Sequence, residues 1–123
     1  MIEKRIHQRF GPLVIKASFT QGGVERDGYL TNVSVSGAFL AVDSPPPVES
    51  EVELKAVLPW RLGELRAGAR VVWRSAGGRD DERSKLAGAG LLFTRLDPSA
   101  ERLLHAYLER FVELAAQIDD TSA

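Results

Sequence analysis

The sequence predicts an all-β domain: a closed barrel of six short antiparallel strands, followed by one amphipathic α-helix. From Pro12 to Phe93, apolar and polar residues alternate with a period of two, which is typical of strands whose two faces meet different surroundings. Turn residues interrupt this alternation repeatedly, and closing six such strands into a barrel leaves no exposed sheet edge. After residue 97 the apolar residues recur every three or four positions, which is the period of a helix.

The first three expected strands end at residues that sheets do not accommodate. The strand that begins near Leu13 stops at Gln21-Gly22-Gly23, where the glycines fit a hairpin turn. A second strand is expected from about Val24 to Val33. A third, over residues 38–42, stops before Ser44-Pro45-Pro46-Pro47, because proline has no N–H to donate to a neighbouring strand. Each break therefore predicts a turn or a loop.

The next three strands show the same alternation. Apolar residues occupy every second position of 52–58 and again of 66–74, where three arginines lie on the opposite, outward face. Residues 77–83 begin with two glycines and are otherwise charged, so they predict an exposed hairpin tip. The sixth strand is expected from about Leu86 to Thr94.

A helix is expected over residues 98–118. Asp97 is a candidate for the N-cap, and Pro98 suits the first helical position. The apolar residues that follow form one stripe, made of Leu103, Leu104, Tyr107, Leu108, Phe111, Val112, Ala115 and Ile118. This stripe needs cover, either from the mouth of the barrel or from a second copy of the chain, so a homodimer is one expectation.

Length and composition fit one domain. The chain has 123 residues, of which 44% are apolar and 27% charged, and this is enough for a single core without a covalent cross-link. We expect the domain to span residues 1–118. It would consist of an N-terminal arm (1–11), the barrel (12–96) and the helix (97–118), with residues 119–123 as a tail.

The residue inventory argues against several classes of function. With no cysteine and only His7 and His105, the chain offers no thiol nucleophile and no histidine-rich metal site. We therefore expect no catalytic residue, no metal, no cofactor and no enzymatic activity. The 16 basic residues balance 17 acidic ones, which argues against nucleic acid or an anionic membrane as the partner. No apolar run approaches the roughly 20 residues that span a bilayer, so a cytoplasmic protein is expected.

Charge is distributed unevenly along the chain. Residues 1–16 contain four basic residues and one acidic residue, whereas residues 97–123 contain six acidic and two basic ones. This asymmetry suggests that the N-terminal end handles an anion.

Two short motifs about 25 residues apart carry the most information about function. The first is Arg5-Ile6-His7-Gln8-Arg9, and the second is Asn32-Val33-Ser34-Val35-Ser36-Gly37. Together they resemble the RxxxR and [D/N]xSxxG signatures of the PilZ domain, the bacterial receptor module for the second messenger cyclic di-GMP. Residues 37–40 and 88–93 also resemble parts of that family, and the likeness covers nearly all of residues 3–112. It implies a Greek-key barrel and a role in signal transduction.

The resemblance implies that Arg5, Arg9, Asn32, Ser34 and Gly37 bind the nucleotide, and their chemistry fits that role. A guanidinium can bond in a bidentate manner to phosphate oxygens or to the O6/N7 edge of guanine. Asn32 and Ser34 are two residues apart, which places both side chains on the same face of the second strand. An amide oxygen can accept from guanine N–H groups, and a glycine permits close approach of the backbone.

Four further residues are secondary candidates for contact with the nucleotide. Lys4 and His7 lie in or beside the first motif, and Ser36 can serve ordinary turn chemistry. Trp73 can stack on a purine. However, it falls at the same alternate positions of its strand as the apolar residues before it, which favours a place in the core. Asn32 stands where the family more often has Asp, and a neutral amide makes weaker bonds to guanine than a carboxylate does.

Three functions are compatible with these observations. The first is a non-catalytic cyclic di-GMP receptor that switches a downstream protein partner. The second keeps the fold without the nucleotide, as an adaptor that contacts proteins through the helix stripe and the segment at Trp60. The third is a small nucleic-acid-binding barrel, which would need a row of exposed aromatic residues beside a basic strip.

Overall fold

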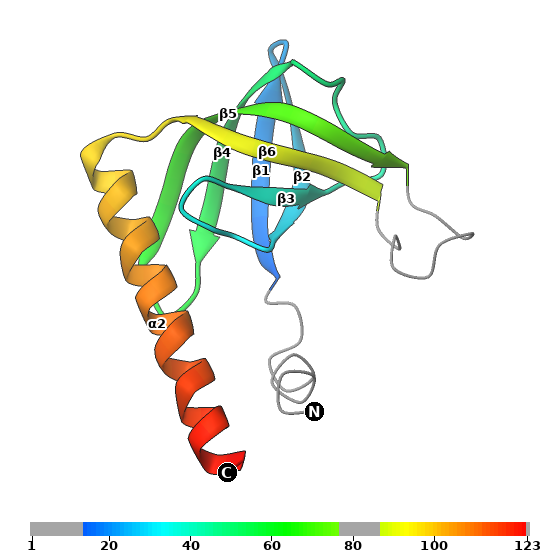
Figure 1. The fold of residues 1–123 in the computed structure, drawn as a ribbon. Coiled ribbons are helices and arrows are strands. Elements are labelled where there is room, and N and C mark those ends of the chain that lie inside the picture. The colour runs from blue at the N-terminus through cyan, green and yellow to red at the C-terminus, as the bar shows by residue number, and fades with distance from the viewer. Residues whose placement is uncertain (1–13, 77–86, 123) are drawn as a thin grey trace.

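The structure, a computed structural model, describes residues 14–76 and 87–122. Six strands close into an antiparallel barrel, and one long helix runs along its side (Figure 1). The order of strands around the barrel is β1-β2-β3-β6-β5-β4. The elements are β1 (Ile15–Gln21), β2 (Val24–Thr31), β3 (Gly37–Ala41), β4 (Glu51–Leu58), β5 (Gly63–Ala76), β6 (Ala87–Arg95) and α2 (Pro98–Ser122). The predicted fold class is therefore confirmed.

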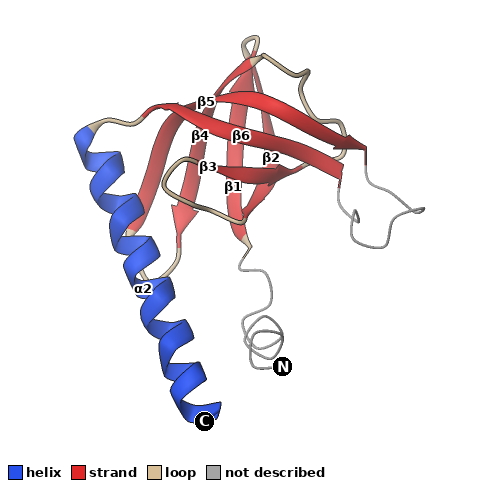
Figure 2. Cartoon of the chain, in the orientation of Figure 1, coloured by secondary structure: helices blue, strands red, loops and turns tan. Residues whose placement is uncertain are grey.

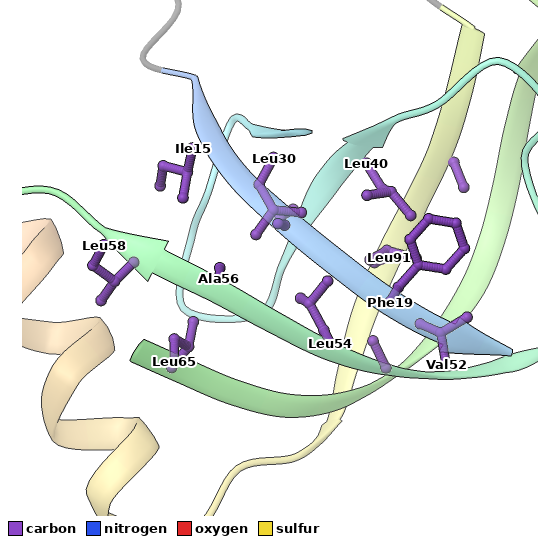
Figure 3. Packing of buried hydrophobic residues seen from close by; sticks show 14 of the residues in the cluster. Ile15, Phe19, Leu30, Leu40, Val52, Leu54, Ala56, Leu58, Leu65 and Leu91 are labelled. Atoms are coloured by element: carbon purple, nitrogen blue, oxygen red, sulfur yellow. The ribbon is translucent and has the colours of Figure 1, made fainter. Parts of the chain in front are cut away.

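The core fills the inside of the barrel with every second side chain of the strands. On β4 the exposed and buried positions alternate along almost the whole strand, as the sequence predicts. Figure 3 shows side chains from several strands meeting in this interior. The largest fully buried residues are Phe19, Leu30, Leu40, Val52, Leu54, Leu65, Val71 and Leu104. Burial of each such side chain stabilises the fold by about 1.5–3 kcal/mol relative to its exposure.

Two boundaries differ from the sequence prediction. Strand β2 ends at Thr31 rather than near Val33, because the next residue, Asn32, adopts a left-handed conformation with φ of 52°. Helix α2 continues to Ser122 instead of stopping at residue 118, so the expected tail is mostly helical. The hairpin tip predicted at residues 77–83 lies outside the described residues.

Helix α2 begins at the predicted cap and packs against the barrel. The carboxylate oxygen Oδ1 of Asp97 accepts a hydrogen bond of 2.8 Å from the backbone N–H of Ala100. Ala100, Leu104 and Tyr107 are buried, so the N-terminal half of the stripe is covered by the chain's own barrel. Figure 2 shows the C-terminal half of the helix continuing past the strands.

Candidate functional site

The second motif lies in an open hollow on the outer surface of the barrel. The hollow has a volume of about 290 Å³ and forms where the β2–β3 loop meets β5 and β6. It brings together five of the residues that the sequence singled out, with an apolar floor beside them. The lining residues are Asn32, Ser34, Ser36, Gly37, Ala38, Phe39, Val72, Trp73, Gly90 and Leu91.

The loop of the second motif is held by the side chain of Ser34. Its Oγ accepts hydrogen bonds from the backbone N–H groups of Ser36 and Gly37, at 3.2 and 3.3 Å. The backbone N–H of Ser34 in turn donates to the carbonyl oxygen of Gly37 at 2.8 Å. The hydroxyl of Ser34 therefore stabilises the loop, whatever else it binds. Ser36 is exposed beside it, with the two hydroxyl oxygens 3.2 Å apart.

Asn32 reaches the hollow in a different way from the one predicted. The prediction that Asn32 and Ser34 share one face of a strand is wrong, because β2 has already ended and Asn32 turns the chain with a positive φ. Asparagine tolerates this conformation better than most residues. Asn32 is exposed, and among residues 14–76 and 87–122 its amide has no hydrogen-bond partner. The amide is therefore available to a ligand in the hollow.

Gly37 has a steric role between two strands. It pairs with Leu92 across the β3–β6 ladder, and a Cβ at Gly37 would overlap the carbonyl oxygen of Leu91. Its φ is not in the left-handed region, so the position needs a glycine for space rather than for backbone freedom.

Trp73 lies on the outer surface, and the interpretation that places it in the core is wrong. The ladder pairs Val71 with Leu91 but Trp73 with Gly90, so β5 contains one extra residue at this point. Such a bulge reverses the alternation of side chains, and Trp73 is 51% exposed. Its ring stacks on Phe39 with centroids 5.4 Å apart. A Cβ on Gly90 would overlap the indole Nε1, so the ring lies directly against the β6 backbone.

Sequence reasoning missed Phe39 and Gly90 as parts of this site. A signal for them was present, because Gly88 and Gly90 alternate along β6 and each leaves space for a ring on a neighbouring strand. The ring above Gly88 is Phe39, and the ring above Gly90 is Trp73.

The residues of the first motif, with Lys4 and His7, lie outside the described residues, but the place where their segment joins the barrel is defined. Ile15, the first residue of β1, pairs with Leu30 near the end of β2. The chain before β1 therefore begins two positions from Asn32 across the ladder. Since a chain spans at most about 3.3–3.6 Å per residue, Arg9 is within about 21 Å of Ile15.

A larger hollow of about 610 Å³ lies elsewhere, on β2 and β3. Its lining includes Arg26, Asp27, Tyr29 and Asp43, and among the described residues it includes none of the second motif. Size alone does not identify a ligand site, whereas converging polar groups and a stacking surface do, so we take the smaller hollow as the candidate site. Within the described residues, no group of His, Asp or Glu side chains could hold a metal ion. No helix in that part of the chain is long and apolar enough to cross a membrane.

The comparisons with solved structures agree with this fold. The PilZ domain of Escherichia coli YcgR with c-di-GMP is similar with a TM-score of 0.64 at 13% identity, covering 87% of this chain and 88% of that one. Inhibitor of motility (MotI/DgrA) of Bacillus subtilis gives a TM-score of 0.66 at 15% identity over 83% of this chain, which spans only 49% of that protein. The PilZ domain of CeSA from a cellulose-synthesizing bacterium gives 0.54 at 18% identity, over 76% and 87% of the two chains.

The sequence itself gives a more specific result. No match was found among curated proteins. The family model described as the PilZ domain matches residues 3–110, which include both motifs, all six strands and the first half of α2. The chain therefore belongs to the PilZ domain family.

Proposed function

We propose that this domain is a non-catalytic, cytoplasmic receptor for cyclic di-GMP, with residues 1–11 as its ligand-binding arm, and that binding switches a protein partner. The observation that carries the proposal is the convergence of the Asn32 amide, the Ser34 loop and the exposed face of Trp73 in one hollow. The RxxxR segment joins the barrel beside the same hollow. The similar domain of YcgR was solved with c-di-GMP, which supports the choice of ligand.

Each group has a chemical role in the proposal. The amide oxygen of Asn32 accepts from the N–H groups on one edge of guanine. Trp73 offers an open ring face, and stacking of a base on an aromatic side chain is worth about 1–3 kcal/mol. Arg5 and Arg9 supply bidentate bonds to phosphate or to guanine O6/N7, and each such pair is worth about 1–3 kcal/mol.

These contributions reach a useful affinity. Micromolar binding needs about 8 kcal/mol net. The available contacts are two arginine contacts, one stacked base and the hydrogen bonds of the Asn32 loop. They supply this binding free energy only if most of them form together. The arm is therefore essential in the proposal, because the hollow lies at the lower limit of about 300 Å³ that is usual for ligand pockets.

The test is a calorimetric titration of the full chain with cyclic di-GMP, using GTP as the control ligand. Saturable heat with cyclic di-GMP and none with GTP would support the receptor. No heat at protein concentrations of about 100 μM would reject it, because a complex with a dissociation constant near 1 μM would then be almost saturated. The adaptor that works without nucleotide would be favoured by that result.

Asn32→Asp is expected to bind cyclic di-GMP about five-fold more tightly. A carboxylate forms charge-assisted bonds that exceed neutral ones by about 1 kcal/mol, and aspartate also tolerates the left-handed conformation at this position. Titrations of both proteins at the same salt concentration measure the difference. Asn32→Ala is the matched control and should bind more weakly than the unaltered chain. If the aspartate and alanine variants bind equally well, Asn32 does not contact the base.

A further inference from the structure

A third hollow, smaller than the two described above, lies between α2 and the turn that joins β4 to β5. Its volume is about 240 Å³, and it has an apolar floor with charged residues at the rim. We call it the Trp60 groove, and its lining residues are Trp60, Leu62, Ala106, Glu109, Arg110 and Glu113. None of them belongs to the nucleotide site proposed above.

The floor of this groove is rigidly built. Trp60 and Arg61 both have positive φ, at 61° and 58°, so the turn places the indole against the helix. The Trp60 ring stacks on Tyr107 with centroids 5.5 Å apart, and the guanidinium of Arg110 lies 6.0 Å from the centre of the Trp60 ring. Glu109 and Glu113 are exposed at the edge beside Arg110, so the groove combines an aromatic floor with a rim that carries two carboxylates and one guanidinium.

The groove lies near the point where the N-terminal segment joins the barrel. The β1–β4 ladder pairs Ala17 with Ala56, which places the start of β1 beside the end of β4. Ile15 and Leu58 accordingly lie at the same end of the barrel (Figure 3). Trp60 follows two residues after Leu58. The thirteen residues before Val14 can span up to about 45 Å when extended. They start at the end of the barrel where β2 leads into Asn32 and β4 leads into Trp60.

The N-terminal segment is complementary to the groove in composition. Its apolar residues Ile2, Ile6 and Phe10 recur every four positions, and so do Arg5 and Arg9. In a helical turn this spacing places the apolar residues on one side and the two arginines on an adjoining side. Such a segment matches a groove with an apolar floor and a rim that carries carboxylates.

We infer that, without nucleotide, residues 1–13 of the chain dock in its own Trp60 groove, and that cyclic di-GMP withdraws them. Ile6 and Phe10 pack on Trp60 and Leu62, and Arg5 and Arg9 face Glu109 and Glu113. The same two guanidinium groups cannot serve both sites, so docking and nucleotide binding exclude each other. The withdrawn state exposes the groove and the adjoining part of α2 to a partner. Withdrawal rests on the proposed function, whereas docking does not.

The chain offers a direct test, because it has no cysteine and its two tryptophans lie one in each site. A nitroxide is attached to the variant Glu3→Cys, and the indole N–H signals of Trp60 and Trp73 are recorded by NMR. Without nucleotide, we expect the Trp60 signal to be broadened and the Trp73 signal to be sharp. With saturating cyclic di-GMP, the Trp60 signal should recover and the Trp73 signal should broaden. The same sample with the nitroxide reduced gives the reference intensities.

A charge variant tests the competition independently. Glu109→Gln combined with Glu113→Gln weakens docking, so cyclic di-GMP should bind about two- to ten-fold more tightly, as expected for two exposed ion pairs. Glu101→Gln is the matched control, because Glu101 is exposed on the same helix about two turns before Glu109, does not line the groove, and should leave the affinity unchanged.

Each result decides between the alternatives. A sharp Trp60 signal without nucleotide overturns the docking. So does an affinity for cyclic di-GMP that is the same in the double glutamine variant as in the unaltered chain. Nitroxide-bearing chain without ¹⁵N is also mixed with ¹⁵N chain that carries no nitroxide. Broadening of the Trp60 signal in this mixture means that a second copy supplies the segment, which also overturns the docking. If cyclic di-GMP gives no heat, the proposed function fails, yet broadening of Trp60 in the free protein still supports docking.

Discussion

Replacing Gly37 by alanine is expected to lower the free energy of unfolding by about 3 kcal/mol or more, measured by urea denaturation without any ligand. The added Cβ would overlap the carbonyl oxygen of Leu91, which is a backbone atom in the paired strand β6. A backbone atom cannot move aside as a side chain can, so β3 and β6 must separate locally. Overpacking of this kind costs about 1–3 kcal/mol, and more where hydrogen bonds of a ladder are lost as well.

The matched control is Gly68→Ala, at a second buried glycine in the barrel. The three atoms nearest to a Cβ there belong to the side chain of Arg95, at 3.0 Å or more, and that residue is exposed. Its cost should stay below about 1 kcal/mol, in the range of ordinary substitutions. If Gly37→Ala proves as stable as Gly68→Ala and only nucleotide binding is lost, then Gly37 acts on the ligand and our account of the strand contact is wrong.

Most of the barrel could be predicted because its alternation is local. The inward positions of β1 and β4 can be read from the sequence two residues at a time, and the structure buries Ile15, Ala17 and Phe19 as expected. The same reading fails at Trp73, since one extra residue in β5 reverses the faces beyond Val71. A bulge depends on the pairing of β5 with β6, which no local pattern encodes.

The candidate site shows the same division. The motif identified Asn32, Ser34, Ser36 and Gly37, and the structure gathers all four in one hollow. The prediction that a shared strand face brings Asn32 and Ser34 together was wrong. Asn32 instead adopts a left-handed conformation, and Ser34 lies in a loop that its own hydroxyl stabilises. The apolar half of the hollow depends on β3 pairing with β6, two strands that are distant in sequence. Phe39 meets Trp73 only through that register, so sequence spacing could not reveal their contact.

Replacing both Arg5 and Arg9 by alanine is expected to weaken cyclic di-GMP binding beyond what calorimetry at micromolar protein detects. Each bidentate contact is worth about 1–3 kcal/mol, so either single variant should lose roughly 5- to 150-fold in affinity. The double variant should lose at least about 25-fold if the two contacts are independent. The reason is geometric: the described residues provide a floor and one polar edge, and the phosphates need donors from elsewhere in the chain.

Two controls accompany this prediction. One separates the bidentate bonding of arginine from its charge, and the other removes an arginine elsewhere on the surface. Arg5→Lys combined with Arg9→Lys keeps both charges but loses the bidentate bonds, and should recover only a small part of the affinity. Arg66→Ala removes an exposed guanidinium on β5 whose ionic partner is Glu64, and should bind as the unaltered chain does. If the lysine variant binds normally, the arm contributes charge alone. If the double alanine variant binds normally, the first motif is no part of the site, and the hollow must hold its ligand by the Asn32 loop and Trp73.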